Sequence, residues 1–194
     1  MATPRFASPD EVIAATRAWI ERAVIGLDLC PFAKSVYVKD QIRYVVSQAT
    51  HATALVRELK QELGLLAAAN PQALDTTLLI HPLALTAFLD YNDFIGVADA
   101  AIAELGLARV LQLATFHPAY QFAGSAKDDI ANYTNRSPYP MLQLLREASL
   151  DRAVAALPGA HHIYQKNIAT MRRLGPSGWE ALGLSGPDGR ESKG

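Results

Sequence analysis

Apolar residues recur along the chain with two different periods, which predict helices and strands in turn. The first helix begins at a capping sequence, Ser8-Pro9-Asp10-Glu11, where the Ser8 hydroxyl can accept from the backbone of Glu11 and proline suits the first turn. Short runs rich in branched apolar residues separate the helical segments and predict strands. The predicted helices cover residues 9–27, 50–69 and 88–105, and the predicted strands cover residues 42–47, 76–80 and 109–116.

The pattern changes after the third predicted strand. Residues 119–139 show no clear periodicity, and a structureless segment of roughly twenty residues inside a domain is usually functional or disordered. Further helices are predicted over residues 141–148, 149–157 and 163–174. The polar, Gly-rich residues 183–194 predict a disordered tail. The predicted organisation is an N-terminal extension over residues 1–7, a single domain over residues 8–182, and the tail.

Strand–helix–strand units of this length predict parallel strands. The expected fold class is α/β or α+β, with a small, mainly parallel sheet of about three to five strands covered by helices. Two predicted strands run into the same dipeptide, His81-Pro82 and His117-Pro118. Since parallel strands end at the same edge of a sheet, both histidines are expected on one edge, where open α/β sheets place ligands.

Charge and cysteine content narrow the class of protein. The chain has 194 residues, a formal net charge of −1 and few, scattered Lys and Arg, so no nucleic-acid partner is expected. Its one cysteine, Cys30, excludes a disulfide within the chain and is typical of a reducing cytosol. The N-terminus lacks the apolar core of a signal peptide, and no apolar stretch is long enough to span a membrane. We expect a cytoplasmic protein without membrane partners, and the sequence leaves its oligomeric state open.

Three residues are the leading candidates for catalysis. His117 lies at a predicted strand end beside a rigid proline, which suits a general base or metal ligand, although a structural hydrogen bond to the loop is the alternative. His81 has the same placement and either shares a ligand with His117 or caps the next helix. Cys30 is a possible nucleophile, but a lone cysteine beside Leu29 and Phe32 is also typical of core packing.

The aperiodic segment 119–139 supplies the remaining candidates. Arg136 is predicted to anchor an anionic group of the substrate, with clamping of Asp128 or Asp129 as the alternative. Asp128 is itself a candidate base, metal ligand or loop cap. The other candidates are Tyr120 or Tyr133 for stabilising an oxyanion, and Gln121, Asn132, Tyr133 and Asn135 for binding the substrate.

Common cofactor and hydrolase motifs are absent from the chain. It contains no GxGxxG, Walker loop, GxSxG, CxxC or HExxH sequence. No nucleotide cofactor is therefore expected. The sequence does not decide whether the protein binds a divalent metal such as zinc or iron. If it does, the expected ligands are His81, His117 and either Cys30 or Asp128.

Several of these segments together resemble the bacterial "domain of unknown function" family numbered 1415. The resemblance spans roughly residues 10–175 and favours an enzyme over a scaffold, because the matching segments are rich in reactive side chains; it implies no particular reaction. The segments that carry it are Leu29-Cys30-Pro31-Phe32-Ala33, the run Thr76 to Pro82, Tyr91-Asn92-Asp93-Phe94, the run Phe116 to Gly124, and the run Asn132 to Pro140.

The leading hypothesis is an enzyme, hydrolase-like or transferase-like, that acts on a small anionic or amide-containing molecule. His117 would be the base and Cys30 the nucleophile. One alternative is a metal-dependent enzyme at the histidines. The second alternative is a non-catalytic module that binds a small anion.

Overall fold

The computed structural model describes residues 7–156 and 162–184. Most of the predicted N-terminal extension, the predicted helix end at residue 157 and the predicted tail from residue 185 lie outside these residues. In chain order the elements are α1 (Pro9–Trp19), the π-helix η1 (Ile20–Ile25), α2 (Ala33–Val38), β1 (Ile42–Val46), α3 (Ala52–Ala68), β2 (Thr76–Ile80), α4 (Phe88–Glu104), β3 (Leu111–Phe116), the 3₁₀-helix η2 (Ile130–Asn135), β4 (Met141–Arg146), α5 (Glu147–Ala156) and α6 (Ile163–Glu180).

The N-terminal helix begins with the capping box that the sequence predicts. The Ser8 hydroxyl accepts from the Glu11 backbone at 3.3 Å, and the Glu11 carboxylate accepts from the Ser8 backbone at 2.7 Å. The helix then widens into η1 and ends at Gly26, where a Cβ would lie 2.3 Å from the Arg22 carbonyl oxygen. Only glycine fits this close approach, and the turn that follows delivers Cys30.

The sheet has four strands in the order β1-β2-β4-β3. Strand β1 pairs with β2 in parallel, whereas β4 is antiparallel to both of its neighbours, β2 and β3. The α/β class is therefore confirmed, but the prediction of a mainly parallel sheet is wrong. Strands β2 and β3 still run in the same direction, because each is antiparallel to β4.

The predicted helix over residues 141–148 is also wrong, because its first part forms β4. The run Met141 to Leu145 is short and apolar, and such a run does not distinguish a buried strand from a helix by periodicity. In the structure both of its backbone edges are hydrogen-bonded, to β2 and to β3, which stabilises the extended form. Helix α5 begins directly afterwards, at Glu147.

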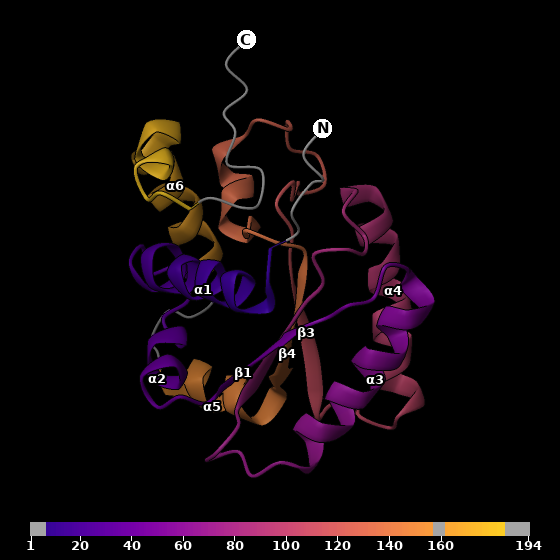
Figure 1. Cartoon of the computed structure of the whole chain (residues 1–194). Helices are drawn as coiled ribbons and strands as arrows, with labels where there is room; N and C mark the ends of the chain where they lie inside the picture. Colours follow the sequence, from indigo (N-terminus) through magenta and orange to yellow (C-terminus); the bar gives the residue numbers. More distant parts are fainter. Residues whose placement is uncertain (1–6, 157–161, 185–194) are drawn as a thin grey trace.

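Helices cover both faces of the sheet, as Figure 1 shows. Helices α3 and α4 pack on one face, here called the α3/α4 face, through a core that includes Leu59, Leu79 and Leu142. Helices α1, η1, α2 and α5 lie over the opposite face, here called the α1/α2 face. Side chains alternate between the two faces along each strand, so neighbouring residues of one strand enter different compartments.

Candidate functional site

The structure places His81 and His117 at the same edge of the sheet, at the ends of β2 and β3. Both rings contact Tyr91 of α4, with ring centroids 5.8 Å from His81 and 5.1 Å from His117. The Tyr91 hydroxyl donates to the carbonyl of Met141 at 2.8 Å and accepts from the backbone of Phe116 at 3.0 Å. The three rings therefore fill the edge on the α3/α4 face and fasten β3 and β4 together.

Both ring nitrogens of His117 are engaged by the protein. Nε2 donates to the Leu85 carbonyl at 3.2 Å, and Nδ1 accepts from the Ala119 backbone at 3.0 Å. The side chain is buried, and burial lowers the pKa of this imidazole. His117 is thus a neutral residue that fixes the start of the loop, with no nitrogen left for a substrate.

His81 is fully buried, and its ring stacks on Tyr91. Nδ1 donates to the Ala84 carbonyl at 2.9 Å, whereas Nε2 has no hydrogen-bond partner among the described residues. Burial lowers the pKa of His81 to about 4, so the ring is neutral at physiological pH.

The aperiodic segment folds around Asn132. This buried amide accepts from the Phe122 backbone and the Ser125 hydroxyl, and donates to the Ala126 carbonyl. Gln121 supports the same turn by donating to the Ser125 carbonyl at 2.7 Å. The segment is therefore an ordered loop whose polar side chains bind its own backbone, while Asp128 stays exposed.

Arg136 also serves this loop. Its guanidinium donates to the carbonyls of Tyr120 and Lys127, at 3.3 and 2.7 Å, and lies 4.0 Å from the centre of the Tyr133 ring. The Tyr120 hydroxyl bonds the hydroxyl of Thr115. Arg136 therefore clamps the loop. It does so through backbone carbonyls rather than through Asp128 or Asp129, as the sequence suggested.

A cavity of about 700 Å³ lies on the other side of the sheet, on the α1/α2 face. Its floor is the sheet itself, including Leu78, Ala114 and Phe116, and its walls come from η1, α2, α5 and α6. A volume of this size accommodates a small organic molecule. Of the residues predicted for the site, Cys30 and Asn135 line this cavity.

Cys30 and His117 lie on opposite faces of the sheet. Phe116 lines the cavity with Cys30, whereas His117, the next residue, packs against Phe88 on the α3/α4 face. The expected Cys30–His117 pair is therefore not formed. The expected metal set of His81, His117 and Cys30 fails for the same reason, and no group of three His, Cys, Asp or Glu suited to a metal occurs among the described residues.

The Cys30 thiol sits at the start of α2, on the cavity wall. Burial raises its pKa, and the negative charge of Asp28 adds to the rise, while the backbone N–H groups of Phe32 and Ala33 oppose it. Asn167 of α6 donates to the Leu29 carbonyl at 2.8 Å, and its own Oδ1 is buried without a partner among the described residues. Cys30 is thus a protonated thiol at neutral pH, held in the apolar turn between η1 and α2.

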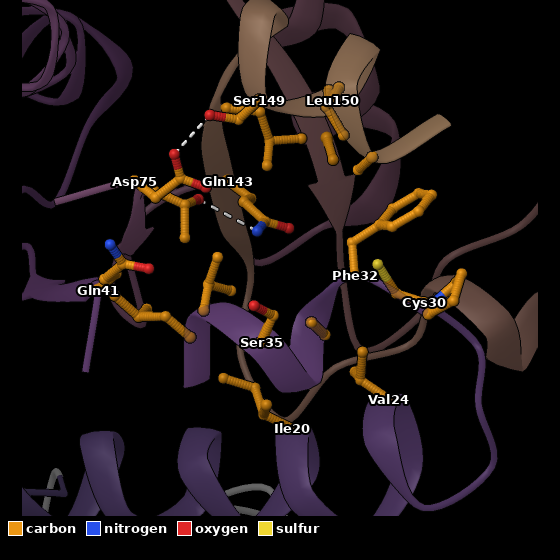
Figure 2. Close-up of a pocket in the computed structure, with 18 of the residues that line it drawn as sticks. Ile20, Val24, Cys30, Phe32, Ser35, Gln41, Asp75, Gln143, Ser149 and Leu150 are labelled. Carbon is orange, nitrogen blue, oxygen red and sulfur yellow. Dashed lines mark hydrogen bonds between the residues drawn. The ribbon is translucent and has the colours of Figure 1, made fainter. Parts of the chain in front are cut away.

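Gln143 of β4 presents a fixed acceptor to the cavity. The Thr76 hydroxyl donates to the Leu144 carbonyl at 2.7 Å, so its oxygen accepts from Gln143 Nε2 at 3.1 Å. This relay fixes the amide, and Figure 2 shows the Gln143 oxygen turned toward Cys30 and Phe32.

Two further acceptors border the cavity, on the side of Gln143 away from Phe32 (Figure 2). Gln41 Nε2 donates to the carbonyls of Pro71 and Gln72, at 3.3 and 2.6 Å, which leaves its oxygen facing inward (Figure 2). The Asp75 carboxylate accepts from the Ser149 hydroxyl at 2.5 Å. The cavity therefore presents acceptor oxygens along its wall and apolar side chains such as Phe32 and Val24 beside them.

Sequence reasoning missed Gln41, Asp75 and Gln143. One signal was present, because Gln143 interrupts an otherwise apolar run from Met141 to Leu145. A polar residue inside a buried strand requires a partner or a ligand.

None of the described helices is long and apolar enough to cross a membrane.

The low pKa of His81 predicts a pH-dependent stability. Between pH 6.5 and pH 4 the unfolded chain binds a proton that the folded chain does not, so the free energy of unfolding falls as the pH is lowered through this window. The slope contributed by His81 is at most about 1.4 kcal/mol per pH unit. His81→Asn keeps a donor for the Ala84 carbonyl but does not titrate.

Urea unfolding of His81→Asn at several pH values should give a shallower slope than wild type. The internal control is the range above about pH 7, where neither the folded nor the unfolded chain binds a proton at this ring and the two slopes should coincide. An unchanged slope in His81→Asn would contradict the neutral, buried state of this ring.

The clamp formed by Arg136 predicts a loss of stability in Arg136→Lys. Lysine lacks the planar fork that reaches both carbonyls, so we expect a cost of about 1–2 kcal/mol, or roughly 5 °C in melting temperature. Arg57→Lys, on the exposed side of α3, serves as control and should melt like wild type. Equal melting temperatures for both variants would leave the clamp without support.

Comparison of the chain with known proteins identifies its family but does not identify an activity. No curated protein and no solved structure matches the chain. A family model described as "Protein of unknown function (DUF1415)" matches residues 11–181, which covers the sheet, the loop and the whole cavity wall. The chain therefore belongs to the DUF1415 family.

Proposed function

We propose that this protein binds a small amide-bearing molecule in the cavity on the α1/α2 face. The observation that carries the proposal is that Gln41 and Gln143 present fixed acceptor oxygens to a largely apolar cavity. Amide oxygens whose orientation is fixed by hydrogen bonds within the protein are complementary to the N–H groups of a ligand. The earlier expectation of an anionic ligand depended on Arg136, which does not line the cavity.

A second candidate function is hydrolysis of such an amide by Cys30. It is favoured by the position of the thiol on the cavity wall, beside the backbone N–H groups of Phe32 and Ala33. In this reaction sulfur bonds to the amide carbon, the C–N bond breaks, and the thiol proton leaves with the amine. Water then cleaves the thioester, which restores the thiol and releases an acid. The Phe32 N–H would stabilise the oxyanion that forms on the carbonyl oxygen, since the Ala33 N–H already donates to the Cys30 carbonyl at 3.1 Å.

Alkylation of Cys30 tests the binding proposal. Because the pKa of the thiol is raised, iodoacetamide should react slowly at pH 7 and faster as the pH rises. Benzamide at about 10 mM, a concentration that fills a millimolar site, should slow the reaction of the folded protein at least threefold. Intact-mass spectrometry measures both rates, and the urea-unfolded chain is the control in which benzamide should have no effect.

The two candidates give different results in the same assay. Benzamide that binds, as seen by ligand-observed NMR, without protecting Cys30 would contradict the cavity as its site. For the hydrolytic candidate, phenyl acetate should leave an acetyl group on Cys30, visible as a mass increase that Cys30→Ser lacks. Protection without acetylation would support binding alone.

A further inference from the structure

The side chain of Gln143 lies on the floor of the cavity, where a single hydrogen bond orients it. Its register partners on the neighbouring strands are Leu78 of β2 and Ala114 of β3, and both line the same cavity. Neither of these side chains has a hydrogen-bonding atom. Within the described part of the chain, the only hydrogen bond of the Gln143 amide runs from Nε2 to the Thr76 hydroxyl, at 3.1 Å. The orientation of this amide therefore depends on Thr76.

The Thr76 hydroxyl can only accept from Gln143. Thr76 is buried, and its one hydroxyl hydrogen is donated to the Leu144 carbonyl at 2.7 Å. If the Gln143 amide were reversed, its oxygen would face the Thr76 oxygen and one hydrogen bond would be lost. The amide nitrogen therefore faces Thr76, and the amide oxygen faces Cys30 and Phe32, as Figure 2 shows.

The fixed direction of the amide determines which ligand groups can pair with it. The two ends of a glutamine amide have nearly the same shape, so an unanchored glutamine can turn about its last bond and present either its oxygen or its NH₂ group. The anchored Gln143 presents its oxygen. A ligand N–H group placed there gains a hydrogen bond, whereas a ketone or a fully substituted amide nitrogen loses its water and gains none.

We infer that Thr76 determines the specificity of this cavity: through Gln143 it selects amides that carry at least one N–H group over ketones and tertiary amides of the same shape. The inference rests on the proposed function, since it narrows the ligand of the same cavity to primary and N-monosubstituted amides. The N–H group of such a ligand lies beside Gln143, on the side of the cavity that Cys30 borders. Thr76 is a positioning residue, because it acts through the Gln143 amide.

Benzamide and acetophenone test this selection, because they differ only in an NH₂ group that is replaced by CH₃. Ligand-observed NMR titration gives the ratio of their two dissociation constants, and comparing the ratio between variants cancels the more apolar character of acetophenone. Thr76→Val keeps the branched shape and removes the hydroxyl, so that the freed Gln143 amide can donate to the ketone. The ratio should shift by about threefold or more in favour of acetophenone. Thr76→Ser restores a hydroxyl and should keep the wild-type ratio.

The matched control is Thr77→Val, at the next position of β2. Thr77 is fully buried on the opposite face of the sheet, and its hydroxyl has no hydrogen-bond partner among the described residues. This variant also loses one threonine hydroxyl, but it should keep the wild-type ratio. An equal shift in Thr77→Val and Thr76→Val would contradict the assignment to Thr76.

Gln143→Met keeps the test decisive if Thr76→Val fails to fold. It retains the length of the side chain, removes the amide oxygen, and should shift the ratio in the same direction as Thr76→Val. A wild-type ratio in whichever of these two variants folds would overturn the inference, while binding of benzamide to the wild-type cavity would still support the proposed function. Failure of wild-type protein to bind benzamide would overturn the proposed function itself.

Discussion

The antiparallel insertion of β4 between β2 and β3 is the constraint on which the rest of the structure depends. It satisfies both backbone edges of β4 and keeps β2 and β3 in the same direction, so that their ends meet at one edge of the sheet. It also fixes the alternation of side chains at the centre of the sheet. Leu142 and Leu144 enter the core beneath α3 and α4, and Gln143 enters the cavity on the α1/α2 face.

The sheet therefore separates two groups of chemically active residues that lie close together in sequence. On the α3/α4 face, the histidines at the strand ends are neutral, buried and packed against Tyr91, which is the pattern of a structural cluster. On the α1/α2 face, Cys30 and the acceptors of Gln41 and Gln143 border open space. Physical arguments for a binding site apply to the second group, because its polar atoms border a cavity, whereas the unpartnered Nε2 of His81 is fully buried.

Local rules predicted much of the fold. The capping box at Ser8, the helical faces of α3 and α4, and the strands β1, β2 and β3 follow from spacing and capping chemistry within a few residues. The shared edge of His81 and His117 follows from the direction of the crossovers. The sequence-based predictions failed where tertiary contacts determine the secondary structure. The segment β4 is a strand because it is hydrogen-bonded to β2 and β3. The short helix α2 was not predicted, and it follows the turn that η1 and Gly26 determine.

The candidate site was harder to predict than the fold. Of the residues proposed from the sequence, the structure places Cys30 and Asn135 in the cavity wall, and their roles there stay predictions. The engagement of both His117 nitrogens depends on the loop backbone at Leu85 and Ala119, and the face of the sheet that a residue enters depends on strand pairing; the sequence shows neither. The decisive residue, Gln143, belongs to the strand that was misassigned. Soaking crystals of the protein with a library of small fragments tests the central claim most directly: fragments with N–H donors should occupy the cavity between Gln143 and Phe32, whereas fragments gathered at the histidine edge, with this cavity left empty, would contradict it.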